Sequence, residues 1–323
     1  MTREYEYAVR LFLAWLNEKY HREFALDDGQ TGKLANGQDV WHAEDPAGGA
    51  FDLACAELSE GDAAWDERRA ALCSRLDEAR PGAYLLWVPP GADLPEGEPD
   101  ESEWVRRVVL AASKIASGRS TEVRLPVRLM LGKVREEGGY ASVTGGLGRH
   151  WTDISSRTNG SFYLDSRGLN RFTRDEEERT QLYDHIGLLS QGLAVGDAME
   201  FEHEDAWSLQ RLPRGAAAEG MADGWAITGC PPGFEPEDGG VLRKLLRRRL
   251  AEAKEALANA SGTRALVLIG AYDYMEYEIA GPSLRGFDPS LAAPFDVIAL
   301  LADAELKPLR LSRLPFAVDA SAT

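Results

Sequence analysis

The stretch AFDLACAELS, residues 50–59, is an apolar run that carries Glu57 near its end. A run of this length, bounded by turn residues, predicts a buried strand. Residues 62–79 follow with a helical pattern that stops at Pro81-Gly82, a typical helix stop signal. A second apolar strand is predicted at residues 84–88. The order of strand, helix and strand indicates a unit in which the helix packs on a sheet.

The rest of the chain extends this pattern. The other predicted elements are helices at 4–20, 101–117, 174–193 and 241–260 and strands at 40–43, 265–269 and 295–301. Continuously apolar strands such as 265–269 are typical of a sheet buried on both faces. We therefore expect an α/β or α+β protein with one central mixed sheet. Strands 50–58, 84–88, 265–269 and 295–301 should belong to it, flanked by the helices at 62–79 and 241–260.

The domain organisation is expected to follow four segments. Residues 1–90 form an αβ region, and residues 91–117 hold a proline-rich linker and a helix. Residues 118–173 form a β-rich basic segment with valines, threonines and tyrosines between glycine turns. Residues 174–323 form a helical and αβ region that packs with the N-terminal region.

Charge and cysteine content narrow the class of protein. A formal net charge of −17 favours solubility and opposes loose binding to nucleic acid or anionic lipid. The cysteines Cys55, Cys73 and Cys230 form no CxxC pair, which argues against a disulfide framework and a cysteine zinc site. A reducing cytosol fits them best. No apolar run approaches membrane-spanning length, so we expect a cytoplasmic protein without a membrane partner.

Carboxylates near the first strands are the leading candidates for chemistry. Asp39 begins one predicted strand, Glu57 lies late in the next, and Glu6 (less favoured, Glu4) lies in the preceding helix. Mg²⁺ prefers oxygen ligands and uses one or two carboxylates plus water and phosphate oxygens. A metal held by Asp39 and Glu57 would activate water and stabilise charge on a phosphate. The pattern predicts a Mg²⁺ site held by Asp39 and Glu57.

This order of residues resembles the PD-(D/E)XK nuclease superfamily, over about residues 4–90. The resemblance implies an acidic helix residue, an Asp at the start of a strand and Glu-x-Lys on the next strand. It assigns catalytic roles to Glu6 (less favoured, Glu4), Asp39 and Glu57. It implies a metal-dependent nuclease fold in a bacterial context. Ser59 stands where the lysine belongs, and Lys33 is the available substitute. The missing lysine would normally help to position or activate the attacking water.

A structural interpretation of the same carboxylates remains open. Asp39 suits a turn, Glu57 suits a solvent-facing edge strand, and Glu4 and Glu6 suit the positive end of a helix dipole. A fold that keeps the superfamily architecture without its activity is the alternative.

The basic segment offers a second candidate site. Arg157, Arg167 and Arg171 lie among the aromatic residues of 118–175, and arginines with stacking aromatics are suited to single-stranded nucleic acid. The alternative is that the aromatics form a β core with the arginines on its wet face. The dense acidic stretch at residues 200–205 lacks a metal-ligand spacing and is interpreted as an exposed acidic strand or turn.

Two functions therefore remain open. The first is a PD-(D/E)XK-like protein, active or degenerate, that acts on or binds nucleic acid. The second is a non-catalytic protein-binding or assembly protein with an α/β fold, which the net charge of −17 and the missing lysine favour.

Overall fold

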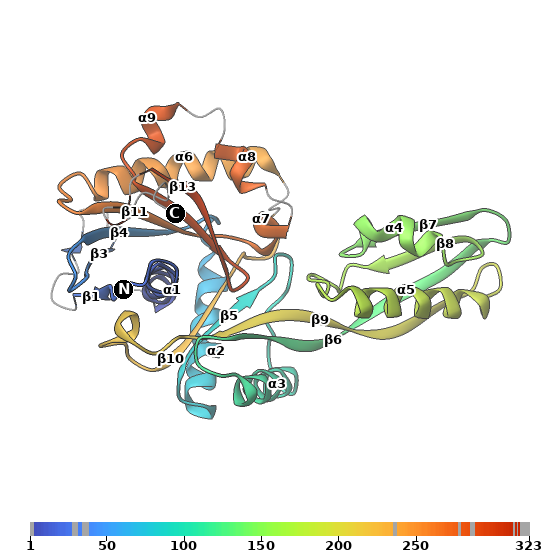
Figure 1. Cartoon of the computed structure of the whole chain (residues 1–323). Helices are drawn as coiled ribbons and strands as arrows, with labels where there is room; N and C mark the ends of the chain where they lie inside the picture. Colours follow the sequence, from blue (N-terminus) through green and yellow to red (C-terminus); the bar gives the residue numbers. More distant parts are fainter. Residues whose placement is uncertain are drawn as a thin grey trace. The chain divides into compact units, whose positions relative to one another are not determined.

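The computed structural model of the chain divides into two compact units (Figure 1). Unit 1 comprises residues 1–121 and 208–323, and unit 2 comprises residues 122–207. The structure describes residues 3–27, 32–33, 39–234, 238–276, 279–284, 288–312, 314 and 316.

The quoted stretch forms β4, in the interior of the first sheet of unit 1. Its strands are β1 (Ala25–Leu26), β2 (Gly32–Lys33), β3 (Asp39–Glu44), β4 (Ala50–Glu57), β11 (Thr263–Ile269), β12 (Val297–Ala302) and β13 (Glu305–Leu311). They run in the order β1-β3-β4-β11-β12-β13, with β2 paired to β3. β4 is antiparallel to β3 and parallel to β11. Burial on both faces explains its continuous apolar sequence.

Helix α1 (Arg3–Tyr20) lies between this sheet and a second set of strands in unit 1. There β5 (Ala83–Val88) pairs in parallel with β10 (Gly224–Gly229) and antiparallel with residues 208–211 of β9 (Ala198–Arg211). One core cluster joins Phe12 of α1 to Leu53 of β4 and Leu85 of β5. A helix covered on two sides must be apolar over most of its circumference, as α1 is.

The remaining helices of unit 1 cover the outer faces. α6 (Gly239–Ala256) packs Leu246 and Leu250 against the opposite face of the first sheet, with Ala54 and Leu266. α2 (Ala63–Ala79) contacts β10, and α3 (Asp100–Lys114) contacts α2. Short helices complete the unit: η2 (Ala216–Ala218), α7 (Tyr272–Glu276), α8 (Ala280–Leu284) and α9 (Pro289–Ala292).

The fold class predicted from the sequence is confirmed, and the predicted strand partners need one correction. Mixed sheets flanked by helices are present, and the strands at 50–57, 263–269 and 297–302 share one sheet. The strand at 83–88 belongs to the second sheet, because α1 needs a cover on the side that faces away from β4. The single central sheet is therefore replaced by two.

Unit 2 is a β-rich layer covered on one face by helices. Its elements are β6 (Ser120–Arg135), β7 (Gly139–Gly145), η1 (Gly148–His150), α4 (Trp151–Ser155), β8 (Gly160–Ser166), α5 (Glu176–Gln191) and β9 up to residue 207. The strand order is β9-β6-β8-β7. Leu131, Phe162 and Ile186 join the sheet to α5 in one core cluster. The segment expected at residues 118–173 lies largely within unit 2, which continues to residue 207 and includes α5 packed on the preceding strands.

Candidate functional site

The structure brings only part of the predicted carboxylate site together. Glu57 is the last residue of β4. Glu6 makes a salt bridge of 2.8 Å with Arg10, one turn along α1, so its carboxylate serves a neighbouring buried arginine. Glu4, the less favoured helix residue, is the one that reaches the surroundings of Glu57. Asp39 begins β3, and its side chain lies outside the described residues, as does that of Lys33.

Arg69 of α2 is the centre of this group. Its Nη1 lies 3.5 Å from Oε1 of Glu57, and its Nη2 lies 2.6 Å from Asp66 and 3.6 Å from Glu4. We call Glu4, Glu57, Asp66 and Arg69 the Arg69 cluster. Its ion pair with Glu57 is largely buried, with side-chain exposures of 11% for Arg69 and 17% for Glu57.

Arg69 also holds the edge of β10. Its Nη1 donates to the carbonyl of Ile227 at 3.0 Å. On the same strand the N–H of Trp225 donates to Asp77 at 2.7 Å, and the N–H of Ile227 bonds Cys73. Positions 66, 69, 73 and 77 recur at helical spacing and form one stripe of α2. The stripe supplies donors and acceptors to backbone groups that a further strand would otherwise satisfy.

Charge and burial oppose each other inside the cluster. Burial raises the pKa of Glu57 above its ordinary value, against the lowering effect of Arg69. Burial alone would lower the pKa of Arg69, but Glu57 and Glu4 outweigh it and the pKa of the guanidinium is raised. Burial makes the ionised form of Glu57 costly, and Arg69 is the cation that favours this form.

The position of the missing lysine is occupied by Ser59. Ser59 is buried, and its carbonyl accepts from Arg249 of α6 at 3.4 Å. The same guanidinium donates from Nε to the carbonyl of Glu57 at 2.9 Å. Two arginines thus surround the end of β4, and both bond backbone carbonyls. Within the part of the chain that the structure describes, no group of three or more His, Cys, Asp or Glu is arranged to hold a metal ion.

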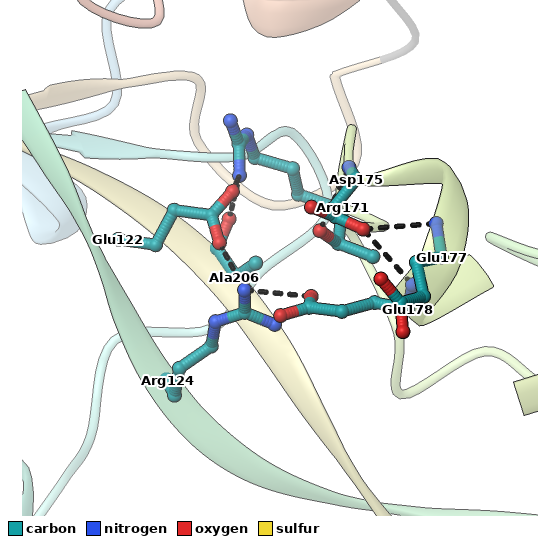
Figure 2. A network of polar contacts seen from close by, with 8 residues as sticks. Glu122, Arg124, Arg171, Asp175, Glu177, Glu178 and Ala206 are labelled. Carbon is teal, nitrogen blue, oxygen red and sulfur yellow. Dashed lines mark hydrogen bonds and ion pairs between the residues drawn. The ribbon is translucent and has the colours of Figure 1, made fainter. Parts of the chain in front are cut away.

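Arg171, one of the arginines predicted to contact nucleic acid, is a buried residue of unit 2. Only 4% of its side chain is exposed. It donates to the carbonyl of Ala206 at 2.5 Å and to Glu122 at 3.0 Å, and Figure 2 shows these contacts beside Arg124. Its backbone N–H donates to the buried Asp205 at 2.7 Å. In this conformation Arg171 fixes the chain against β9 and is not accessible to a phosphate.

Arg157 and Arg167 are more exposed, and each is paired with a carboxylate. Arg157 donates to Asp184 of α5 at 2.7 Å. Arg167 is 79% exposed and makes a salt bridge of 2.5 Å with Asp165, which lowers the pKa of that carboxyl. A phosphate would have to displace these acids.

The whole of unit 2 is acidic, although residues 118–175 are basic. Residues 122–207 contain ten Lys and Arg side chains and fifteen Asp and Glu side chains, a formal balance of −5. Acids of α5 and β9 reverse the sign that the shorter segment suggested.

Comparisons with family models, with curated proteins and with solved structures give no match for this chain. The resemblance to the PD-(D/E)XK superfamily therefore stays a hypothesis that rests on the residues quoted for it. Within the described residues, no helix is long and apolar enough to cross a membrane.

Sequence reasoning missed Arg69, the residue that organises the cluster. Asp66 and Arg69 look like an ordinary pair one turn apart on a solvated helix face. The available signal was the stripe of Asp66, Arg69, Cys73 and Asp77, which mixes a thiol and charges at one helical spacing.

Proposed function

We propose that this protein is a non-catalytic protein-binding or assembly protein that retains a nuclease-like arrangement of α1, β3 and β4. The observation that carries the proposal is the position of Arg69 against Glu57. A metal-dependent nuclease needs a carboxylate whose oxygens are free for a divalent cation. Here a guanidinium takes that place, 3.5 Å from Oε1 of Glu57.

Arg69 cannot leave this place without a structural cost. It holds Ile227 of β10 at 3.0 Å and Asp66 at 2.6 Å. Movement away from Glu57 would leave a buried carbonyl without its donor, which costs about 1–3 kcal/mol. A metal ion in the place of Arg69 would also need Glu4 and Asp66 as ligands or counter-charges. In the structure both carboxylates already face the guanidinium of Arg69.

The charge of unit 2 supports a protein partner over nucleic acid. Binding to phosphates depends on clustered Lys and Arg that release counterions. Residues 122–207 have a balance of −5, and Arg157 and Arg167 are already paired with acids. Acidic surfaces select basic partners and give salt-dependent association.

A second candidate, a PD-(D/E)XK-like nuclease, is supported by one observation. Glu4 of α1 and Glu57 of β4 approach the same arginine, so a helix acid and a strand-end acid meet as the superfamily pattern requires.

A cleavage assay separates the two candidates. The purified chain would be incubated with Mg²⁺ or Mn²⁺ and labelled single-stranded and double-stranded DNA and RNA, beside Glu57→Gln and the control Glu137→Gln on an exposed turn. We expect no cleavage that depends on Glu57. Metal-dependent cleavage that Glu57→Gln abolishes and Glu137→Gln retains would establish the nuclease instead.

Affinity capture tests the positive half of the proposal. The tagged full chain would be used to recover partners from a lysate of the source organism treated with nuclease, and each partner would be purified and titrated against it. We expect at least one partner to bind directly. Capture that disappears entirely after nuclease treatment would favour nucleic acid.

A further inference from the structure

The outer edge of β9 in unit 2 has no neighbouring strand within the described sheet. β9 pairs with β6 along the sheet, and its pairing with β5 covers residues 208–211. Residues 198–204 therefore have a strand neighbour on the β6 side only, and at Ala206 the outer side is bonded by Arg171. A sheet edge of this kind presents a row of backbone donors and acceptors to any extended chain that approaches it.

The direction of the backbone groups can be worked out along this strand. The carbonyl of Asp197, just before β9, accepts from Lys133 of β6 at 3.0 Å, so odd-numbered residues face β6. At Ala206 the N–H donates to the carbonyl of Arg171 at 3.2 Å, away from β6. Figure 2 shows Ala206 and the Arg171 side chain that bonds its carbonyl. Because strand residues alternate, the N–H and C=O of Glu200, Glu202 and Glu204 point outward.

A groove of about 530 Å³ lies at this end of the sheet. It is lined by residues of α5 and β9, including Leu182, Glu202 and Glu204, and by Arg124 of β6, whose guanidinium is already paired with Glu178 of α5. Burial lowers the pKa of His203, at the same groove, which favours its neutral form. Because side chains alternate along a strand, Glu202 and Glu204 lie on one face of β9 and the half-buried His203 lies on the other.

Charge decides what kind of strand fits. Glu200, Glu202 and Glu204 alternate along β9 and share one face of the sheet. Glu200 makes an exposed ion pair of 3.8 Å with Arg128 of β6, so a partner cation has to share or displace that arginine. Like charges directly opposite each other destabilise a strand pair, and opposite charges stabilise it. A second copy of this edge would place glutamates against glutamates, and a phosphate backbone would be repelled. A chain with Lys or Arg at every second position would place cations opposite Glu202 and Glu204 and would compete with Arg128 for Glu200.

We propose that the outer edge of β9 from Glu200 to Glu204 binds an extended segment of a partner protein that carries Lys or Arg at alternate positions. The segment adds a strand to the sheet of unit 2, with main-chain hydrogen bonds supplying affinity and the glutamates supplying selectivity. Its intervening side chains face the groove beside Leu182. The inference rests on the proposed protein-binding function and names the surface and the chemistry of its partner.

The test uses defined peptides and the full chain. A fluorescein-labelled peptide of alternating Lys and Val, seven residues long, would be titrated with the protein and followed by fluorescence anisotropy. A Glu-Val peptide and a Lys-Val peptide N-methylated at the alternate amides that would face β9 are the comparison probes. We expect the Lys-Val peptide to bind and the N-methylated one to bind about tenfold more weakly or worse, because each methyl group removes a main-chain donor.

Variants of the edge provide the second arm. Glu202→Lys should weaken binding of the Lys-Val peptide about tenfold and favour the Glu-Val peptide. Glu202→Pro removes the outward N–H without touching the bonds to β6, and should weaken both peptides. The matched control is Glu137→Lys, which makes the same charge change on the turn between β6 and β7. A circular-dichroism melt confirms folding, and if Glu202→Pro fails to fold, Glu202→Lys and the N-methylated peptide decide the question.

The inference would be overturned by equal binding of the N-methylated peptide, by equal losses in Glu137→Lys and Glu202→Lys, or by no binding of the Lys-Val peptide. A partner captured by the wild-type chain and bound equally by Glu202→Lys would exclude this edge and leave protein binding in place. A failure of the proposed protein-binding function would be detected by a different assay, as metal-dependent cleavage that Glu57→Gln abolishes.

Discussion

Replacement of Arg69 by Met tests the structural role of the Arg69 cluster. Methionine keeps much of the side-chain volume and removes the charge and the donors. The carbonyl of Ile227 loses its 3.0 Å hydrogen bond, and Glu57 loses its cation inside a pair that is 11% and 17% exposed. Removal of one partner from a buried pair costs about 3–5 kcal/mol. We expect a loss of that size in the free energy of unfolding, measured by urea denaturation with tryptophan fluorescence.

The pH dependence of the same variant follows from the pKa of Glu57. Burial raises it above the ordinary value of 4.5. At a pH between the unfolded and the folded pKa of Glu57, the folded state binds more protons than the unfolded state. The stability that protonated Glu57 contributes is therefore fully present below its unfolded pKa and is lost as pH rises through its folded pKa. Arg69→Met removes the charge that opposes burial, so the folded pKa rises further. The stability deficit should therefore be larger at about pH 8 than at about pH 5.

A double-mutant cycle completes this experiment. In Arg69→Met/Glu57→Gln no unpaired carboxylate remains at the end of β4, so the double variant should recover part of the loss, with a coupling of about 0.5–3 kcal/mol. A single-variant loss below about 1 kcal/mol, as for an exposed pair, or an equal deficit at both pH values, would refute the reasoning.

Three further predictions concern other parts of the fold. Phe12 is fully buried between the two sets of strands, so Phe12→Ala should lower the free energy of unfolding by about 3–5 kcal/mol; a loss below about 2 in urea denaturation would contradict the central position of α1. Asp205 accepts hydrogen bonds from the backbone N–H groups of Asn170 and Arg171 and from the indole of Trp207. Asp205→Ala should therefore lower the free energy of unfolding by about 3 kcal/mol or more in urea denaturation. An unchanged urea midpoint would exclude this role. Burial raises the pKa of Cys73 to about 12, and Cys55 and Cys230 are buried. Titration with a disulfide reagent near pH 8 should therefore modify none of the three thiols in the folded chain and all three in denaturant. Rapid reaction of the native protein would contradict this burial.

Local sequence patterns predicted many of the elements, although not β10 or β13, and did not predict which strands pair. The continuous apolar run of β4 predicted a strand buried on both faces, and its hairpin with β3 follows from the turn at 45–49. An apolar strand such as β5 looks the same in any sheet, however, because pairing depends on residues far away in the chain. The sequence of α1, apolar over most of its circumference, was the indication that two layers enclose it.

The candidate site shows the same division. Glu57 was correctly placed at the end of a strand, because alternation and turns are local. Its partner was not found, since Arg69 reaches it only after α2 packs beside β10. Arg171 was expected to be accessible because arginine is mostly a surface residue. Its burial depends on Ala206 and Glu122, more than thirty positions away on either side.

The division of unit 1 into two sequence segments has a consequence for the order of synthesis. Unit 2 lies within one uninterrupted segment, residues 122–207, and all of it has been made before β10 emerges. β4 instead needs β11, whose pairing joins Phe51 to Thr263. At about 5–20 residues per second, β4 waits roughly 10–40 s on the ribosome for this neighbour. During that interval its apolar faces depend on chaperones or on temporary contacts, so a nascent chain stalled before residue 263 should contain a folded unit 2 and a protease-sensitive N-terminal segment.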